Sequence, residues 1–205
     1  MKLRTASLSL LAFCLVALPA AAQTLYSNGP IDGQDTAWTI NFGFAVSDSF
    51  TLANASTVNG LSFGGWMFPG DSFAGVEVLI TSSEFGGTTY TDQFINLTQS
   101  GCFLNQAGFN VCTESGSFGT DVNLTAGTYW LTLQNANGTD DQLGWDQNSG
   151  PSLASQNSLG TIPSESFTLF GSSTSTGGTT PEPGSIVLFG SGVAGLAGVL
   201  RRKLF

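Results

Sequence analysis

Apolar and polar residues alternate over much of the chain between residues 23 and 170, a pattern typical of strands with one buried face. The longest alternating run places an apolar residue at every second position: Trp38, Ile40, Phe42, Phe44 and Val46. This run predicts one half-buried strand over residues 38–46. Residues 128–133 form the next clearest run, and Ala126-Gly127 directly before it predicts a turn.

Shorter apolar stretches between turn-forming residues predict the other strands. They cover residues 50–52, 58–63, 76–80, 88–97, 109–111, 118, 122–124, 144–145 and 166–170. Gly86-Gly87 is expected to turn residues 76–80 back on 88–97 as a hairpin, and the stretches within 109–124 are expected at a sheet edge. Residues 134–142 are expected to form a polar loop.

Short strands between residues rich in Gly, Ser and Thr, with no sustained helical period outside the two chain ends, predict an all-β fold. We expect a single antiparallel β-sandwich of jelly-roll type, with a β-barrel as the alternative. Residues 23–170 have the size of one domain.

The N-terminus has the three parts of a secretory signal peptide. Lys2 and Arg4 precede an apolar stretch over residues 8–18, which small residues follow at Ala20-Ala21-Ala22. We therefore expect residues 1–22 to be removed after Ala22 during export, which leaves Gln23 as the first residue.

The C-terminus has three ordered elements after a Ser/Thr/Gly linker at residues 171–180. These are Pro181-Glu182-Pro183, an uncharged apolar run over residues 186–200, and the basic cluster Arg201, Arg202 and Lys203. As a helix the run spans about 22 Å, which is short for a permanent anchor in a hydrocarbon core of about 30 Å. The basic cluster predicts that the C-terminal end lies in the cytoplasm. Residues 23–170, which we call the body, are therefore expected outside the inner membrane.

Residues 181–205 resemble the PEP-CTERM sorting signal of Gram-negative bacteria, because the triplet, the helix and the basic end follow in the same order. The resemblance implies recognition by an exosortase, a membrane cysteine transpeptidase thought to cut near the triplet. It also implies export through the Sec machinery, a precursor held in the inner membrane by the helix, and a mature form at the cell surface or in the extracellular matrix.

The distribution of charged residues along the chain argues against several functions for the body. The chain has five Lys and Arg residues and no His, and all five lie in the two end signals, whereas every acidic residue except Glu182 lies between Asp32 and Glu165. A body without cations argues against nucleic acid and anionic lipid as partners. It also lacks a His base, a Schiff-base Lys and an Arg clamp for phosphate, so we expect no enzyme activity.

Cys102 and Cys112 are the two cysteines that remain after the signal peptide. In an oxidising compartment they are expected to form a disulfide around a small loop.

A polar loop near the end of the domain offers oxygen atoms of the kind that calcium binds. Asn137, Asp140, Asp141 and Asp146 are the candidate ligands, and no other cofactor is expected. The alternative is that these are ordinary turn residues.

A sugar site is a second candidate, with Trp145 as a stacking platform beside Asp146, Gln147 and Asn148. Trp66 is the next choice, and Trp38 and Trp130 are expected in the core because they lie in predicted strands. The alternative is that Trp145 also packs in the core.

Together these patterns predict an exported, exosortase-sorted protein with a structural or adhesive body. The first alternative is a carbohydrate-binding module of the extracellular polysaccharide matrix. The second is a small glycan-active enzyme that uses paired carboxylates, such as Glu77 with Glu84 or Asp140 with Asp146.

Overall fold

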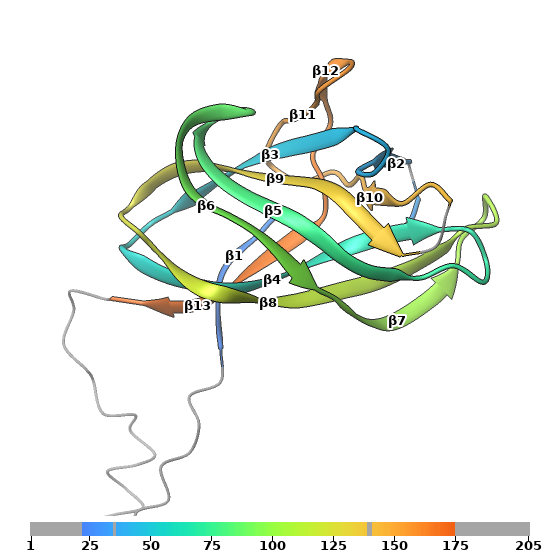
Figure 1. Ribbon diagram of the computed structural model, residues 1–205, viewed down its shortest axis with the longest axis horizontal. Coiled ribbons are helices and arrows are strands. Elements are labelled where there is room, and N and C mark those ends of the chain that lie inside the picture. Colours follow the sequence, from blue (N-terminus) through green and yellow to red (C-terminus); the bar gives the residue numbers. More distant parts are fainter. Residues whose placement is uncertain (1–21, 35, 139–140, 175–205) are drawn as a thin grey trace, which may run out of the picture.

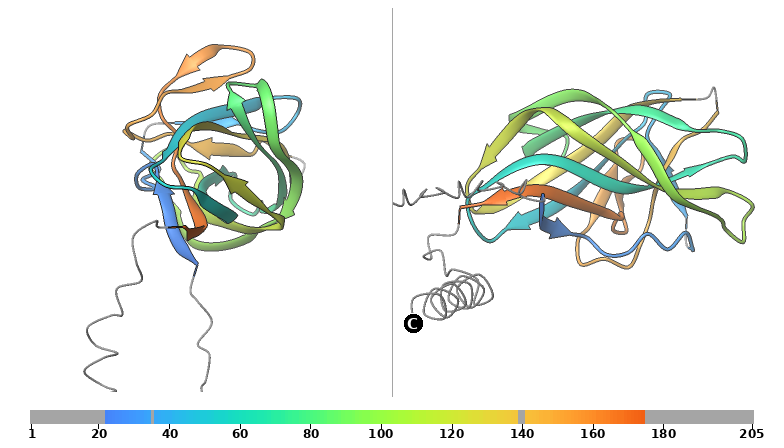
Figure 2. Two further views of the ribbon diagram at one scale, coloured as in Figure 1. Left: turned by 90° about the vertical axis from the view of Figure 1, so that its left-hand side faces the viewer. Right: turned by 90° about the horizontal axis from the view of Figure 1, so that it is seen from below.

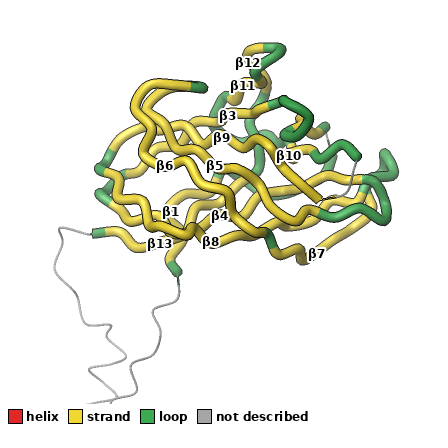
Figure 3. The backbone as a smooth tube through the Cα atoms, in the orientation of Figure 1, coloured by secondary structure: helices red, strands yellow, loops and turns green. Residues whose placement is uncertain are grey.

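The computed structural model describes residues 22–34, 36–138 and 141–174, and these residues contain strands and turns but no helix (Figure 1; Figure 3). The predicted membrane helix at 186–200 and all of the predicted signal peptide except Ala22 lie outside these ranges. The described part is therefore all-β, as the alternating pattern predicted.

A seven-stranded antiparallel sheet forms one layer. Its strands are β1 (Gln23–Ser27), β2 (Ala37–Thr39), β4 (Ser56–Met67), β7 (Thr98–Leu104), β8 (Asn110–Leu124), β10 (Gly144–Asp146) and β13 (Phe167–Ser173). Strand β4 is its centre, since β8 pairs along one edge of β4 and β13 and β10 pair in succession along the other. Strands β1, β2 and β7 then pair with β13, β10 and β8.

A six-stranded antiparallel sheet forms the other layer, in the order β12-β11-β3-β9-β5-β6. Its strands are β3 (Ala45–Leu52), β5 (Phe73–Ser83), β6 (Gly86–Asn96), β9 (Gly127–Gly138), β11 (Ala154–Gln156) and β12 (Gly160–Ile162). The chain changes sheet at eight of its twelve steps from strand to strand, so that β1-β13-β4-β8 in one sheet accompany β3-β9-β5-β6 in the other. Both sheets curl around a common interior (Figure 2).

The interior is apolar and takes side chains from both sheets. Phe50, Ile80 and Leu131 come from the six-stranded sheet, and Phe63 and Leu169 come from the seven-stranded sheet; all five are at most 1% exposed. Burial of each such side chain contributes roughly 1.5–3 kcal/mol, so alternate inward positions account for much of the stability.

The prediction of one strand over residues 38–46 is wrong, because the chain turns at residues 41–44 between β2 and β3. Phe42 and Gly43 have positive φ angles of 55° and 87°, and the Phe42 side chain is 67% exposed. The apolar alternation continues through the turn, although β2 and β3 belong to different sheets. Periodicity alone could not separate the two strands.

The region of residues 109–124 also differs from its prediction. It forms one long strand, β8, which pairs with both β4 and β7, whereas short edge elements were expected. Its apolar pattern is interrupted because β8 bulges between Ser117, which pairs with Gly60, and Val122, which pairs with Val58. Gln93 of β6 caps this bulge, since its Oε1 accepts a hydrogen bond of 2.8 Å from the Gly119 amide.

Three smaller predictions can be compared directly with the structure. The β5–β6 hairpin is confirmed, but it turns at Glu84 and Phe85, before the expected Gly86-Gly87. Strand β9 continues through Gly138, so the polar stretch predicted as a loop over residues 134–142 is partly strand. Strand β13 continues to Ser173, three residues into the predicted linker.

The predicted disulfide between Cys102 and Cys112 is present and joins β7 to β8. Cys112 is buried in the core, whereas Cys102 is exposed. The bond therefore ties an exposed strand to the central part of the seven-stranded sheet.

Candidate functional site

Trp145 does not lie on the surface, so the predicted sugar-stacking platform there is wrong. Its side chain is 0% exposed and packs in T-shaped geometry against Phe63 and Phe167, with ring centroids 6.2 and 5.7 Å away. The indole nitrogen donates a 2.8 Å hydrogen bond to the Ser166 carbonyl. Strand β10 lies between β4 and β2, and this position turns Trp145 into the core.

The three polar residues predicted to accompany Trp145 serve internal contacts. Asp146 is 0% exposed and Asn148 is 2% exposed. Asn148 donates a 2.8 Å hydrogen bond to the Asn28 carbonyl, and half-buried Gln147 accepts a 2.9 Å bond from the Trp38 indole. The four-residue sugar site is therefore part of the framework.

Among the four predicted calcium ligands, Asp146 is separated from the loop. Its Oδ1 accepts a 2.6 Å hydrogen bond from the Trp66 indole, and its Oδ2 accepts one of 3.2 Å from the Asp32 amide. Asn137 and Asp141 are exposed, and Asp140 lies outside the described residues. Calcium binding by Asn137, Asp140 and Asp141 without Asp146 stays a prediction.

Asp48, Asp146 and Glu165 form a buried acidic cluster that the sequence did not predict, although it singled out Asp146 for other sites. All three side chains are 0% exposed, and they come from β3, from β10 and from the segment before β13. Asp48 Oδ2 accepts a 2.8 Å hydrogen bond from the Glu165 amide, and the Ser166 amide donates one of 2.8 Å to the Asp146 carbonyl. The cluster thus connects the two sheets.

Asn28 holds the same region together from β1's end. Its side-chain nitrogen lies 3.0 Å from Asp48 Oδ2 and 2.8 Å from Ser164 Oγ, and its side-chain oxygen accepts a 2.6 Å bond from the Tyr26 hydroxyl. Asn28 is 0% exposed. Asn28 is followed by Gly29 and Pro30, a turn-forming sequence that gives no sign of this role.

The buried acidic cluster contains three oxygen atoms without a hydrogen-bond partner among the described residues: Asp48 Oδ1 and both Glu165 carboxyl oxygens. Burial raises the pKa of Asp48 and of Asp146 to about 6. Burial, and then the charges of Asp48 and Asp146, raise the pKa of Glu165 well above its ordinary value. Since an ionised carboxylate is costly to bury without a partner, burial favours the neutral form of Glu165.

Full burial decides what this cluster can do chemically. A substrate cannot reach carboxyl oxygens that are 0% exposed, although raised pKa values are often found at catalytic acids. The cluster therefore acts within the framework, where a protonated carboxyl can donate a hydrogen bond.

Glu114 of β8 is a second kind of buried acid, apart from that cluster. Its Oε1 accepts a 2.8 Å hydrogen bond from Gln99 of β7, and its Oε2 has no partner among the described residues. Burial raises its pKa to about 7.

Of the two carboxylate pairs predicted for an enzyme, Asp140 with Asp146 cannot be compared, because Asp140 lies outside the described residues, and Glu77 with Glu84 is not brought together. Glu77 lies within β5 and Glu84 lies in the turn after it, so seven extended residues separate them by about 23 Å. Glu77 instead neighbours Asp92 of β6, whose pKa is raised by burial and by the hydrogen bond and charge of Glu77. The fold thus brings half-buried Glu77 and exposed Asp92 together.

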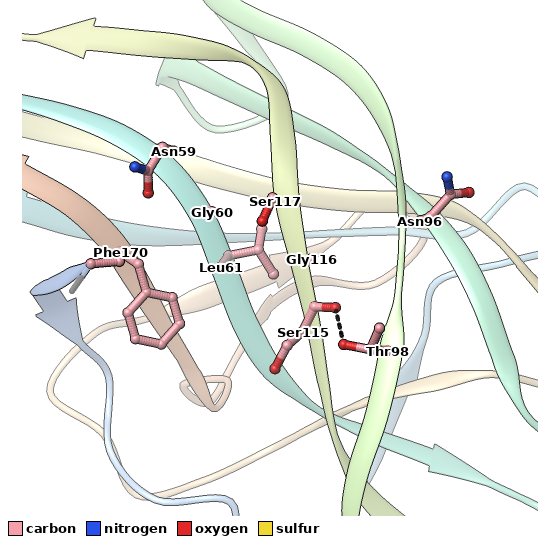
Figure 4. A pocket seen from close by; sticks show the side chains of 10 residues that line it. Asn59, Gly60, Leu61, Asn96, Thr98, Ser115, Gly116, Ser117 and Phe170 are labelled. Carbon is pink, nitrogen blue, oxygen red and sulfur yellow. Dashed lines mark hydrogen bonds between the residues drawn. The ribbon is translucent and has the colours of Figure 1, made fainter. Parts of the chain in front are cut away.

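A groove of about 480 Å³ lies where β4, β8 and the β6–β7 connection meet (Figure 4). We call it the β4–β8 groove. Its uncharged walls come from Asn59, Leu61, Asn96, Thr98, Ser115, Ser117 and Phe170, with Ala22 and the backbones of Gly60 and Gly116. Sequence patterns could not reveal it, because its residues come from five separate segments.

In the described ranges, no group of three or more His, Cys, Asp or Glu residues is arranged to hold a metal ion. The same ranges contain no helix that is long and apolar enough to cross a membrane.

In a comparison with known protein families, residues 179–203 match the PEP-CTERM protein-sorting motif. No curated protein and no solved structure matches the chain. The matched residues include the Pro181-Glu182-Pro183 triplet and the basic cluster, so the resemblance to the PEP-CTERM sorting signal is confirmed.

Proposed function

We propose, on the premise that this chain is a PEP-CTERM protein and an exosortase substrate, that its body has a structural or adhesive role at the cell surface or in the extracellular matrix. The proposal rests on the order of the folded body and the sorting motif along the chain. The folded body reaches Ser173, and the sorting motif begins at residue 179. A spacer this short keeps the body next to the site of processing until the motif is cut.

The body is proposed to be a β-sandwich of jelly-roll type. Strand orders β1-β13-β4-β8 and β3-β9-β5-β6 support this, because a jelly roll places eight strands in two four-stranded layers with the chain passing between them. Such a closed and well-packed body suits a protein that must persist outside the cell.

Binding of extracellular polysaccharide is the second candidate function, and the β4–β8 groove favours it. The groove has a volume within the range of small-molecule sites and presents amide, hydroxyl and aromatic groups. No catalytic role is proposed for the body.

The main proposal is tested by the intact mass of the form recovered from the cell surface. We expect that form to lack residues 1–22 and the segment after Pro183, whereas a variant with Pro181 and Pro183 both changed to Ala should keep its C-terminus and stay with the inner membrane. Recovery of mature surface protein that still ends in Arg201-Arg202-Lys203-Leu204-Phe205 would contradict the proposal.

A further inference from the structure

The polar side chains of the β4–β8 groove are free to bind a ligand. Asn59, Asn96 and Ser117 make no side-chain hydrogen bond to any described residue, and the hydroxyl of Ser115 is equally unused. Thr98 donates its hydroxyl hydrogen to the Ser115 carbonyl at 3.2 Å and can still accept a bond. The groove therefore offers several donors and acceptors that the fold itself does not need.

Two glycines and a bulge form the floor of the groove. A Cβ atom on Gly116 would come within 2.7 Å of the Ile95 side chain and 2.8 Å of the Asn96 carbonyl, and one on Gly60 would come within 2.9 Å of the Gly116 carbonyl. The floor is thus bare backbone. Asn59 lies in the bulge of β4, where its neighbours' pairing shifts register, so its side chain is displayed beside the floor.

Phe170 supplies an apolar wall. Its partly exposed ring lies on one side of the floor, and Asn96 and Thr98 lie on the other side (Figure 4). An aromatic ring facing unused amides and hydroxyls fits a ligand with an apolar face and a rim of hydroxyl groups, which is the chemistry of a pyranose.

The charges around the groove favour a neutral sugar over an anionic one. The groove has no charged side chain, and the body between the two end signals has acidic residues but no Lys, Arg or His. Cleavage after Ala22 would place one cation nearby, the α-amino group of Gln23, but an anionic ligand would find no cationic side chain to pair with and would be repelled by the field of the body. A neutral ligand meets neither penalty.

We propose that the β4–β8 groove binds a neutral polysaccharide, with one sugar ring against Phe170 and its hydroxyl groups on Asn59, Asn96 and Ser117. This inference deepens polysaccharide binding, the second candidate function, and rests on it. Ala22 also lines the groove, so the predicted cleavage after Ala22 would remove one apolar wall residue.

The test uses the mature protein purified from the cell surface and measures binding by calorimetry to three probes: dextran, laminarin and anionic polygalacturonate. We expect binding to at least one of the two neutral glucans and none to polygalacturonate. Phe170→Ala should weaken that binding by about tenfold or more, because the stacking surface is lost. Ser117→Phe, which adds a ring at an exposed position, should block the groove even if Phe170→Ala folds poorly.

Phe42→Ala is the matched control, since Phe42 is 67% exposed in the turn between β2 and β3 and does not line the groove. Its affinity should equal that of the wild type. Glucan binding that survives both groove variants would overturn the site and leave polysaccharide binding standing. Binding to polygalacturonate alone would overturn the neutral-ligand site and leave polysaccharide binding standing. No binding to any of the three probes would overturn both, while surface location from the intact-mass experiment stays independent.

Discussion

At the scale of single residues, three of the four tryptophans differ from their sequence prediction. Trp66 and Trp145, the candidates for a surface site, are buried, and Trp130, expected in the core, is partly exposed. Trp38 is partly exposed but packs against the core, as expected. In β9 the side chains of Tyr129 and Leu131 point inward, so Trp130 between them points outward. An alternating pattern shows that a strand has two faces, but it does not show which face, and therefore which tryptophan, is buried in the core.

Trp145→Ala is expected to destabilise the protein by about 3–5 kcal/mol, the usual cost of removing a large buried ring. The indole fills space between Phe63 and Phe167 and makes a buried hydrogen bond. Urea unfolding followed by circular dichroism measures the change. Trp130→Ala, at a partly exposed position, should cost much less, and equal losses for the two variants would show that Trp145 is not the core residue described.

At the scale of elements, β7 depends on its attachment to β8. All seven residues of β7 are exposed, and β7 pairs with β8 alone among the described strands. It therefore buries little apolar surface of its own, and the Cys102–Cys112 disulfide is the covalent tie that keeps it in place.

Cys102→Ser is expected to lower the free energy of unfolding by about 3 kcal/mol, the chain-entropy value for a closed loop of this length. The urea midpoint of the oxidised wild type is compared with that of the variant. Reduced wild type is the control and should match Cys102→Ser, because both lack the bond. If Cys102→Ser had the same free energy of unfolding as the oxidised wild type, the disulfide would not stabilise the protein by constraining the unfolded chain.

At the scale of the whole molecule, stability should depend on pH in the direction opposite to that of most proteins. Asp48 and Asp146 have pKa values raised from 3.8 to about 6, and Glu114 from 4.5 to about 7, in each case by burial. The folded state therefore keeps protons that the unfolded chain releases, and stability falls as pH rises. Its full value is present below about pH 4 and is lost as pH rises through the folded pKa values.

Thermal unfolding between pH 4 and pH 8 should show this as a falling melting temperature. One carboxyl pKa raised from 3.8 to about 6 corresponds to about 3 kcal/mol, and the contributions of neighbouring carboxyls do not simply add. A body with no cation also repels itself more as its acids ionise. A melting temperature that rises from pH 4 to pH 8 would contradict the buried acidic cluster.

The Glu165→Gln variant distinguishes the effect of the buried acidic cluster on the pH dependence of stability from the effect of surface charge. Glutamine stays neutral, so the variant should be more stable than the wild type at pH 8 and no more stable at pH 4. Glu84→Gln, in the exposed turn between β5 and β6, is the matched control and should follow the wild-type curve. A Glu165→Gln curve parallel to the wild-type curve would place the pH dependence elsewhere.

The sequence by itself determined the all-β class, the strand at residues 128–133, the β5–β6 hairpin, the disulfide and the sorting motif. Each depends on residues that are near in the chain or on residue type alone: alternation, the Cys102 and Cys112 pair, and the ordered triplet, apolar run and basic end. Local chemistry is enough to recognise such features.

Only the tertiary structure decided the register, the buried acidic cluster and the β4–β8 groove. Asp48, Asp146 and Glu165 are far apart in the sequence and look like ordinary surface acids until two sheets enclose them. The groove likewise exists because Gly60, Gly116 and Phe170 meet across β4, β8 and β13. Sheet pairing joins distant segments, and burial then sets the charge and accessibility of each side chain.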